Sequence, residues 1–368
     1  MMNKCYIEKK TKLNEMFKYL FNKKQFASSA NCLLFLHYVN RVFNLRIVST
    51  LSLLLLIIFV WKSRGETNEN VLLFLTFSSN FNSYIRLDER VTFGQYSYIL
   101  NKETILEKCS SKYHNITIAQ SGSLRMLRFD MFGFEGVVHI EKPNVILFDY
   151  MRLQLLAFLW NSKPDRILFI GLGIGILPRT FHLLSPSTLI DIVELDSMIV
   201  DLARKYFSFE DNQSIRIHIK DGRQFLERQR SNQYDMILVD AFTSNGHIPH
   251  TLQTLECLGE YQRVLKSNGI VLGNFVYEHE SRYRQTYARA LFRHVYRGLT
   301  TTNFILIGLN KQAQLFNQSF FEIQARILQQ THSVPEMNWL EEIKYLRDGN
   351  EDPWNRSATI FTDQIVEK

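Results

Sequence analysis

The pattern of hydrophobic and polar positions changes near Tyr150. From Val91 to that point the chain carries short runs in which apolar and polar residues alternate, such as NITIAQ and EGVVHI. Alternation with a period of two is typical of strands with one buried face, so residues 91–150 are predicted to form a small antiparallel β domain. Further along, short apolar runs alternate with longer amphipathic stretches. Such repeated strand–helix units predict an α/β fold over residues 151–368, a Rossmann-like doubly wound sheet with helices on both faces.

The individual elements of the Rossmann-like region follow from the same periodicities. Strands are predicted at residues 166–171, 189–194, 215–219, 234–240, 269–276 and 304–309. Helices are predicted at residues 151–160, 176–184, 197–207, 222–230, 251–266 and 280–297. Most strands would then be joined through a helix, as parallel neighbours in a sheet require.

Residues 1–46 are interpreted as a basic arm outside both folded regions. The arm holds nine Lys or Arg and two Glu, a net charge of +7 that equals the net charge of the whole chain. The rest of the chain is therefore neutral, which argues against a basic groove for nucleic acid in the folded part. Residues 62–90 are polar and mixed, and are interpreted as a linker.

An uncharged apolar segment, 47–61, lies between the arm and the linker. Its fifteen residues, IVSTLSLLLLIIFVW, are slightly fewer than the ~17–25 of a spanning helix. The segment is interpreted as a transmembrane helix, with a buried or interfacial helix and a targeting segment as alternatives. A single-pass membrane protein is expected, and the side of the membrane that the folded region faces stays open.

A glycine-rich turn follows the first predicted strand of the Rossmann-like region. The sequence RILFIGLGIGILPRTF places Gly171, Gly173 and Gly175 in this turn, and Glu194 closes the next strand 23 residues after Gly171. Glycines let the backbone approach a ligand, the N-terminus of the following helix favours electron-rich atoms, and an acid at the next strand end accepts ribose hydroxyls. This combination predicts a site for a nucleoside-type cofactor.

Further acids follow the predicted strands. Asp196 comes after Glu194, Asp221 and Gly222 follow the third strand, and Asp240 closes the fourth. Ligands of doubly wound sheets bind at the carboxyl ends of the strands, so Asp221 and Gly222 would meet an adenine amine and Asp240 the reacting group. Each acid alone could equally be a helix cap or a surface carboxylate. Their recurrence at successive strand ends favours a ligand site.

No metal site is expected. The cysteines have neither CxxC pairing nor the spacing of metal ligands, and are interpreted as buried or idle thiols: Cys5, Cys32, Cys109 and Cys257. His247 and His250 follow the fourth strand. They are alternative candidates for a proton acceptor, or else loop histidines that face solvent.

From about Tyr113 to the C-terminus the chain resembles the spermidine synthase family and its methyltransferase-like relatives. The resemblance rests on GLGIGILPRTF, VELD, KDGRQFL, YDMILVDAF and the tail FTDQIVEK. It implies an amino-terminal β domain that allows a homodimer, a Rossmann-like domain, and S-adenosylmethionine or its decarboxylated form as the ligand. It also implies that Glu194 binds the ribose, that Asp221 and Gly222 bind the adenine, and that Asp240 accepts a proton.

Two departures from the family pattern weigh against polyamine synthesis. Ile174 stands where the GGGDGG sequence of the family has an aspartate for the amine of the decarboxylated cofactor. The sequence DAFT at 240–243 stands where the family has DSSDP, so a second carboxylate is missing. A polyamine cation needs several acids to offset its desolvation. The GLGxG and DAF-type sequences resemble the methyltransferase-like branch instead.

The function predicted from the sequence is therefore that of a membrane-anchored methyltransferase dependent on S-adenosylmethionine. Its acceptor would be an amine or a protein, and Asp240 would orient the attacking amine or accept its proton. S-adenosylmethionine is expected as the cofactor in preference to the decarboxylated form. Two alternatives are a polyamine aminopropyltransferase and a catalytically inactive protein that only binds the cofactor.

Overall fold

The computed structural model describes residues 90–93, 96–99, 103–129, 134–243, 246–300, 303–349 and 354–364. All of these residues belong to one structural unit, Phe74–Lys368. The predicted basic arm 1–46 lies outside the described residues, as does nearly all of the predicted linker 62–90.

The membrane localisation predicted from the sequence is corrected here. No helix within the described ranges is both long and apolar enough to cross a bilayer. The segment 47–61, on which the prediction of an anchor rested, lies outside those ranges.

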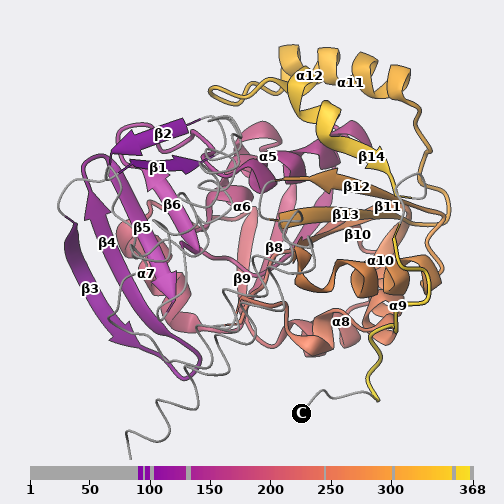
Figure 1. Ribbon diagram of the computed structural model, residues 1–368, viewed down its shortest axis with the longest axis horizontal. Coiled ribbons are helices and arrows are strands. Elements are labelled where there is room, and N and C mark those ends of the chain that lie inside the picture. The colour runs from indigo at the N-terminus through magenta and orange to yellow at the C-terminus, as the bar shows by residue number, and fades with distance from the viewer. Residues whose placement is uncertain are drawn as a thin grey trace, which may run out of the picture. The chain divides into compact units, whose positions relative to one another are not determined.

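The amino-terminal part of the described chain forms two small antiparallel sheets. β1 pairs with β2, and β3, β4, β5 and β6 form a four-stranded sheet in chain order (Figure 1). Their bounds are Arg90–Phe93, Tyr96–Ile99, Thr104–Ser110, Asn115–Ser121, Leu124–Phe129 and Gly136–His139. Apolar residues on both faces of β4 and β5 are buried: Ile116, Ile118 and Leu127 join the main core, and Ala119, Leu124 and Met126 join a smaller cluster. The antiparallel sheet predicted from the alternation of apolar and polar residues in the sequence is confirmed.

The large sheet is mixed rather than wholly parallel. Its eight strands run in the order β14-β12-β13-β11-β10-β7-β8-β9. The strands from β11 to β9 are parallel, whereas β13, β12 and β14 join by antiparallel pairing. In chain order, β7 to β14 span Arg166–Ile170, Leu189–Glu194, Ile215–Ile219, Tyr234–Val239, Leu265–Val276, His294–Leu299, Asn303–Leu309 and Leu346–Asp348. The strand order reverses between β7 and β10, which is where doubly wound sheets bind ligands.

The stretch 280–297 differs most from its predicted structure. The sequence predicts one long helix there, but α10 ends at Arg289 and β12 follows it. Leu291 extends the helical pattern in the sequence, yet it lies in the connection and is 80% exposed. β12 is fixed instead by its six-residue pairing with β13. Long-range strand pairing therefore prevails over the local helical pattern.

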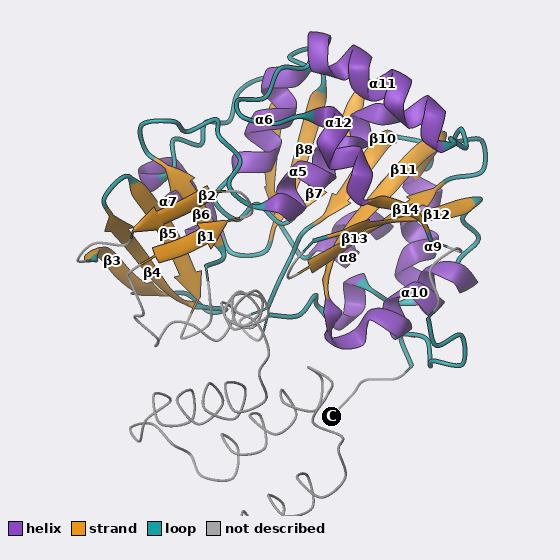
Figure 2. Cartoon of the chain, turned by 45° about the horizontal axis from the view of Figure 1, so that its top comes forward, coloured by secondary structure: helices purple, strands orange, loops and turns teal. Residues whose placement is uncertain are grey.

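Helices cover both faces of the large sheet, as Figure 2 shows. The pleat of β7 sends Ile167 and Phe169 into a core cluster with residues of α6, α7 and α11, and Leu168 and Ile170 into a second cluster with residues of α8, α9 and α10. The α-helices α5 to α12 span Asp149–Leu155, Ile176–Leu184, Ser197–Tyr206, Gly222–Glu227, Leu255–Val264, Glu280–Arg289, Gln318–Thr331 and Trp339–Glu342. The short 3-10 helices η3 to η6 span Leu156–Leu159, His250–Leu252, Tyr277–His279 and Ile343–Tyr345.

A buried carboxylate connects four neighbouring strands of the large sheet. Asp191 on β8 is 2% exposed. It accepts hydrogen bonds from Nε of Arg166 on β7 at 2.8 Å and from the hydroxyl of Tyr234 on β10 at 3.1 Å. Nε2 of His218 on β9 lies 2.9 Å from its other oxygen. A buried charge of this kind is tolerated only while its partners remain in place.

We expect Asp191→Ala to lower the free energy of unfolding by about 1–3 kcal/mol, because it leaves the buried hydroxyl of Tyr234 without its acceptor and removes the anionic partner of Arg166. Chemical denaturation followed by circular dichroism measures this loss. The matched control, Asp201→Ala, removes only an exposed ion pair with Arg204 at 3.8 Å. It should change the free energy of unfolding by less than about 0.5 kcal/mol. Equal losses in the two variants would contradict a special role for Asp191.

Candidate active site

The glycine turn packs directly against the segment that follows β10. The backbone N–H of Asp240 donates to the carbonyl of Ile170, the last residue of β7, at 2.9 Å. Gly171 has φ +98°, and a Cβ placed on it would lie 2.2 Å from the carbonyl oxygen of Asp240. A side chain at position 171 is therefore excluded both by the backbone conformation and by the lack of space. Gly173 and Gly175 also have positive φ, and Gly175 is the N-cap of α6.

Glu194 holds the glycine turn from the side of β8. Its Oε2 accepts the backbone N–H of Leu172 at 2.9 Å, and its Oε1 accepts that of Asp196 at 3.0 Å. Burial raises the pKa of the Glu194 carboxyl, and these backbone donors counteract the shift in part. Each carboxylate oxygen has a second lone pair, so Glu194 can still accept hydroxyl groups of a ligand.

Asp196 and Asp221 both cap helices. Asp196 accepts the backbone N–H of Met198 at the start of α7 at 3.0 Å, and it also accepts a hydrogen bond from the hydroxyl of Ser111. Asp221 accepts the N–H of Gln224 at the start of α8 at 2.9 Å. Both acids therefore act as helix N-caps, which was the alternative to a ligand role. A cap occupies only one oxygen of Asp221, so a contact with a ligand stays a prediction.

Gly222 lies close to the same strand end. A Cβ on Gly222 would be 2.8 Å from the side chain of Ile170. The structure therefore brings the predicted residues of the third strand end next to the glycine turn, as the topology of a parallel sheet requires.

Asp240 lies where three elements meet. Its Oδ2 accepts a hydrogen bond from Nε2 of Gln154 on α5 at 3.0 Å, and its Oδ1 accepts one from Nδ2 of Asn274 on β11 at 2.9 Å. Oδ1 of Asn274 in turn accepts a hydrogen bond from Nδ2 of Asn303 at 3.0 Å, which fixes the orientation of the amide. Burial raises the pKa of Asp240, and the two amide donors lower it in part. The carboxylate is thus held in one orientation and made more basic than an exposed aspartate.

Two further titratable groups, Glu135 and Tyr150, lie near Asp240, and no motif in the sequence marks Glu135. Glu135 immediately precedes β6, and its pKa is raised to about 7 by burial and then by the negative charge of Asp240. Tyr150 lies in the first turn of α5, and burial raises its pKa, as do the charges of Asp240 and Glu135. The charge of Asp240 thus raises the pKa of both groups, and the charge of Glu135 raises that of Tyr150, so the three groups lie within electrostatic range of one another.

Glu135 also lies next to the position where the expected acid of the glycine turn is absent. Its neighbour Gly136 packs against Ile174 so closely that a Cβ on Gly136 would lie 2.7 Å from the Ile174 side chain. The backbone that leads from Glu135 into β6 therefore packs against the residue that replaces the family's aspartate.

The two loop histidines differ in their contacts. Nε2 of His250 donates to the carbonyl of Thr362 at 2.9 Å, which ties η4 to the carboxyl-terminal segment. His247 contacts Glu278 instead. Neither histidine has a described contact with Asp240, so the proton-acceptor role is better placed on Asp240 itself.

Comparisons with known proteins identify relatives of this chain. A family model described as "Spermine/spermidine synthase domain" matches residues 153–297. A polyamine aminopropyltransferase of Vibrio vulnificus is 32% identical over 280 residues, which cover 73% of this chain and 91% of that protein.

Solved structures show the same fold. A probable spermidine synthase from Corynebacterium glutamicum aligns with a TM-score of 0.54 at 21% identity, over 63% of this chain and 89% of that chain. Spermidine synthase from Thermotoga maritima aligns with a TM-score of 0.53 at 18% identity, over 70% and 89% of the two chains.

These relatives correct the leading functional prediction. The sequence motifs favour methyl transfer, but the similar proteins are named aminopropyltransferases, which was the alternative. The predicted transferase class stands, and the methyltransferase-like branch does not. The identity and coverage of the Vibrio protein, together with the matching domain model, show that the chain belongs to the spermidine synthase family.

Proposed function

We propose that the protein is a polyamine aminopropyltransferase, which transfers the aminopropyl group of decarboxylated S-adenosylmethionine to an amine acceptor. The name of the Vibrio relative supports this activity. The observation that carries it is the pair of carboxylates Asp240 and Glu135, close enough for the charge of one to raise the pKa of the other. A site of this kind suits a substrate with amine cations.

The adenosine part of the substrate would lie over the glycine turn. Glu194 would accept the ribose hydroxyls, and Asp221 with Gly222 would meet the adenine. The lone pairs that remain on Glu194 after its backbone bonds support this assignment. The helix N-terminus at Gly175 adds a favourable field for electron-rich atoms of the ligand.

Asp240 would serve the reacting amine. An amine attacks only in its unprotonated form: its nitrogen bonds to the terminal carbon of the aminopropyl group next to sulfur while the carbon–sulfur bond breaks. The new ammonium then loses a proton, and Asp240 is placed to accept it. The Gln154 and Asn274 amides fix the orientation of that carboxylate, and burial makes it more basic.

Glu135 would take over the role of the missing aspartate in the glycine turn. In the family that aspartate is expected to hold the amine of the decarboxylated cofactor, and here Ile174 occupies its position. Gly136, the residue after Glu135, packs against Ile174, and the charge of Asp240 raises the pKa of Glu135. Its carboxylate would attract the ammonium of the decarboxylated form and repel the extra carboxylate of S-adenosylmethionine.

We expect the full-length protein to bind decarboxylated S-adenosylmethionine more tightly than S-adenosylmethionine in calorimetric titrations. Mass spectrometry should show an aminopropyl group, and no methyl group, added to an aliphatic diamine. Glu194→Ala should weaken binding of both forms by about 10–150-fold, because hydrogen bonds to a charged acceptor contribute roughly 1.5–3 kcal/mol.

The matched control is Glu210→Gln, which changes an exposed acid just after α7. It should leave both affinities unchanged. Tighter binding of S-adenosylmethionine, or a methylated product, would contradict aminopropyl transfer. Absence of binding to either form would favour the inactive cofactor-binding alternative.

We expect the affinity for decarboxylated S-adenosylmethionine to rise with pH between 6 and 8. The pKa of Glu135 lies at about 7 in the folded protein, raised from 4.5, so the carboxyl gains the charge that holds an ammonium only as pH passes that value. Glu135→Gln should weaken binding roughly tenfold or more at pH 8 and abolish this pH dependence. Glu135→Gln should also reduce the preference of the protein for decarboxylated S-adenosylmethionine over S-adenosylmethionine.

Stability gives a second readout for the same residue. A raised folded pKa means that the folded state binds the proton more tightly than the unfolded state between pH 4.5 and about 7. The wild-type protein should therefore lose stability as pH rises through that window, and Glu135→Gln should lose less. Glu141→Gln, at an exposed acid, is the control for both measurements. Unchanged profiles in Glu135→Gln would exclude the proposed role.

A further inference from the structure

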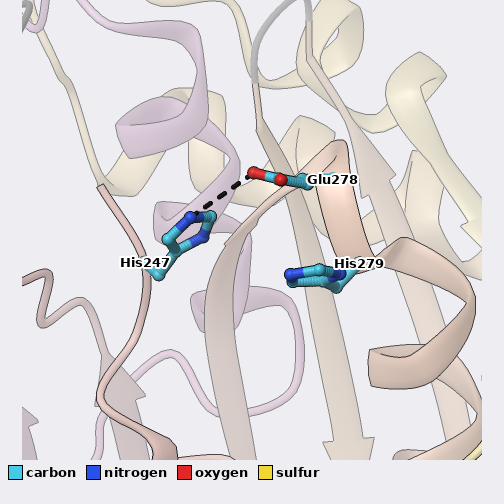
Figure 3. A group of neighbouring side chains, drawn as sticks. All are labelled: His247, Glu278 and His279. Atoms are coloured by element: carbon cyan, nitrogen blue, oxygen red, sulfur yellow. Dashed lines mark ion pairs between the residues drawn. The ribbon is translucent and has the colours of Figure 1, made fainter. Parts of the chain in front are cut away.

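Three potential metal ligands converge beside the ends of β10 and β11. Figure 3 shows His247, from the loop after β10, facing Glu278 and His279 from η5. One ligand atom from each of the three lies within 4.8 Å of the other two. Among the described residues this is the one group of His, Cys, Asp and Glu with such geometry. No cysteine takes part, so the cysteine spacing could not reveal it.

The distances suit a metal ion better than a hydrogen bond. Nε2 of His247 lies 3.4 Å from Oε2 of Glu278, beyond the ~2.7–3.2 Å of ordinary N–H···O hydrogen bonds. Zn²⁺ with tetrahedral bonds of ~2.0–2.1 Å places neighbouring ligand atoms about 3.3 Å apart. The rings of His247 and His279 have centroids 5.7 Å apart, and a nitrogen of His279 lies within 4.8 Å of the ligand atoms of the other two residues.

The environment of His247 also points to a ligand. Its Nδ1 is shielded from solvent and has no hydrogen-bond partner among the described residues. The Glu278 side chain is 65% exposed, so an ion pair alone would contribute little to stability. Beside Glu278 and His279 opens a cavity of about 440 Å³, lined also by Ser281, Asn355 and Thr359. An ion and its water can therefore reach the cluster.

We propose that His247, Glu278 and His279 bind one divalent transition-metal cation of the Zn²⁺ class. One nitrogen of each histidine and the carboxylate of Glu278 would be the protein ligands. Three protein ligands of this type leave a fourth position for water or another small ligand.

The position of the cluster gives such an ion a structural effect near the reacting groups. His247 follows Asp240 by seven residues, and Glu278 follows Asn274 by four. Asn274 donates to Asp240 at 2.9 Å. A bound ion therefore links the two segments that lead away from this hydrogen-bonded pair, and it restrains the wall of the site without contacting Asp240.

Cobalt titration of the full-length protein, prepared without a histidine tag and stripped with a chelator, tests the site. Co²⁺ in a site of nitrogen and oxygen ligands gives visible absorption bands that report its geometry, and Zn²⁺ should displace it. We expect one bound ion whose affinity falls at least about tenfold in His247→Ala and in His279→Ala. Glu278→Gln changes an exposed side chain, so it tests the carboxylate ligand without endangering the fold.

His182→Ala is the matched control. One ring nitrogen of His182 contacts Asn212 at 3.2 Å, and the other has no partner among the described residues, but His182 belongs to no group of three potential ligands in the described part of the chain. Zn²⁺ should raise the unfolding temperature of the wild type and of this control, and not that of His247→Ala or His279→Ala. The difference between wild type and variants also removes any contribution from Cys5, Cys32 and His37 in the amino-terminal arm.

Metal binding that is absent from the wild type, or equal in wild type and all three ligand variants, would overturn the proposal. The titration contains no sulfonium or amine substrate. Its result is therefore independent of whether the protein transfers an aminopropyl group.

Discussion

The close contact between the glycine turn and the end of β10 is the constraint on which the rest of the site depends. The N–H of Asp240 donates to Ile170, and the backbone of Gly171 approaches Asp240 too closely for any side chain. β7 and β10 are adjacent at the point where the strand order reverses, so their carboxyl ends open toward the same side. The glycine turn and the backbone of Asp240 are thereby fixed relative to each other by main-chain contacts, and Glu194 holds the turn from the opposite side.

Around this contact lie three buried or partly buried carboxylates, those of Glu194, Asp240 and Glu135, whose charged forms are destabilised by burial. Burial raises the pKa of Glu194 and of Asp240, and hydrogen-bond donors lower both in part. The pKa of Glu135 is raised by burial and raised again by the charge of Asp240. A ligand that brings positive charge relieves this repulsion when it binds, so the cluster favours sulfonium and ammonium groups over neutral ligands.

Most parallel strands could be predicted from the sequence because each has a local signal, a short apolar run bounded by turn residues. The stretch 280–297 could not, because only its pairing with a distant strand decides its structure. Glu194 and Asp240 could be placed at one edge, since strand ends of a parallel sheet converge there. Glu135 could not, because it precedes a strand of the other sheet, 39 residues before Ile174. Its proximity to the site is a property of the tertiary structure alone.

The wrong prediction of methyl transfer has the same physical origin. Ile174 and the sequence DAFT at 240–243 lack acids that the family carries, and a missing acid in a motif suggests lost polyamine chemistry. An ammonium group, however, responds to the total field of the charges around it, whichever element supplies them. A carboxylate from the four-stranded sheet can therefore act on the same amine as an aspartate in the glycine turn. For cation sites, similarity along 91% of a relative consequently outweighs two departing motif positions, because a charge can be supplied by a different element of the same fold.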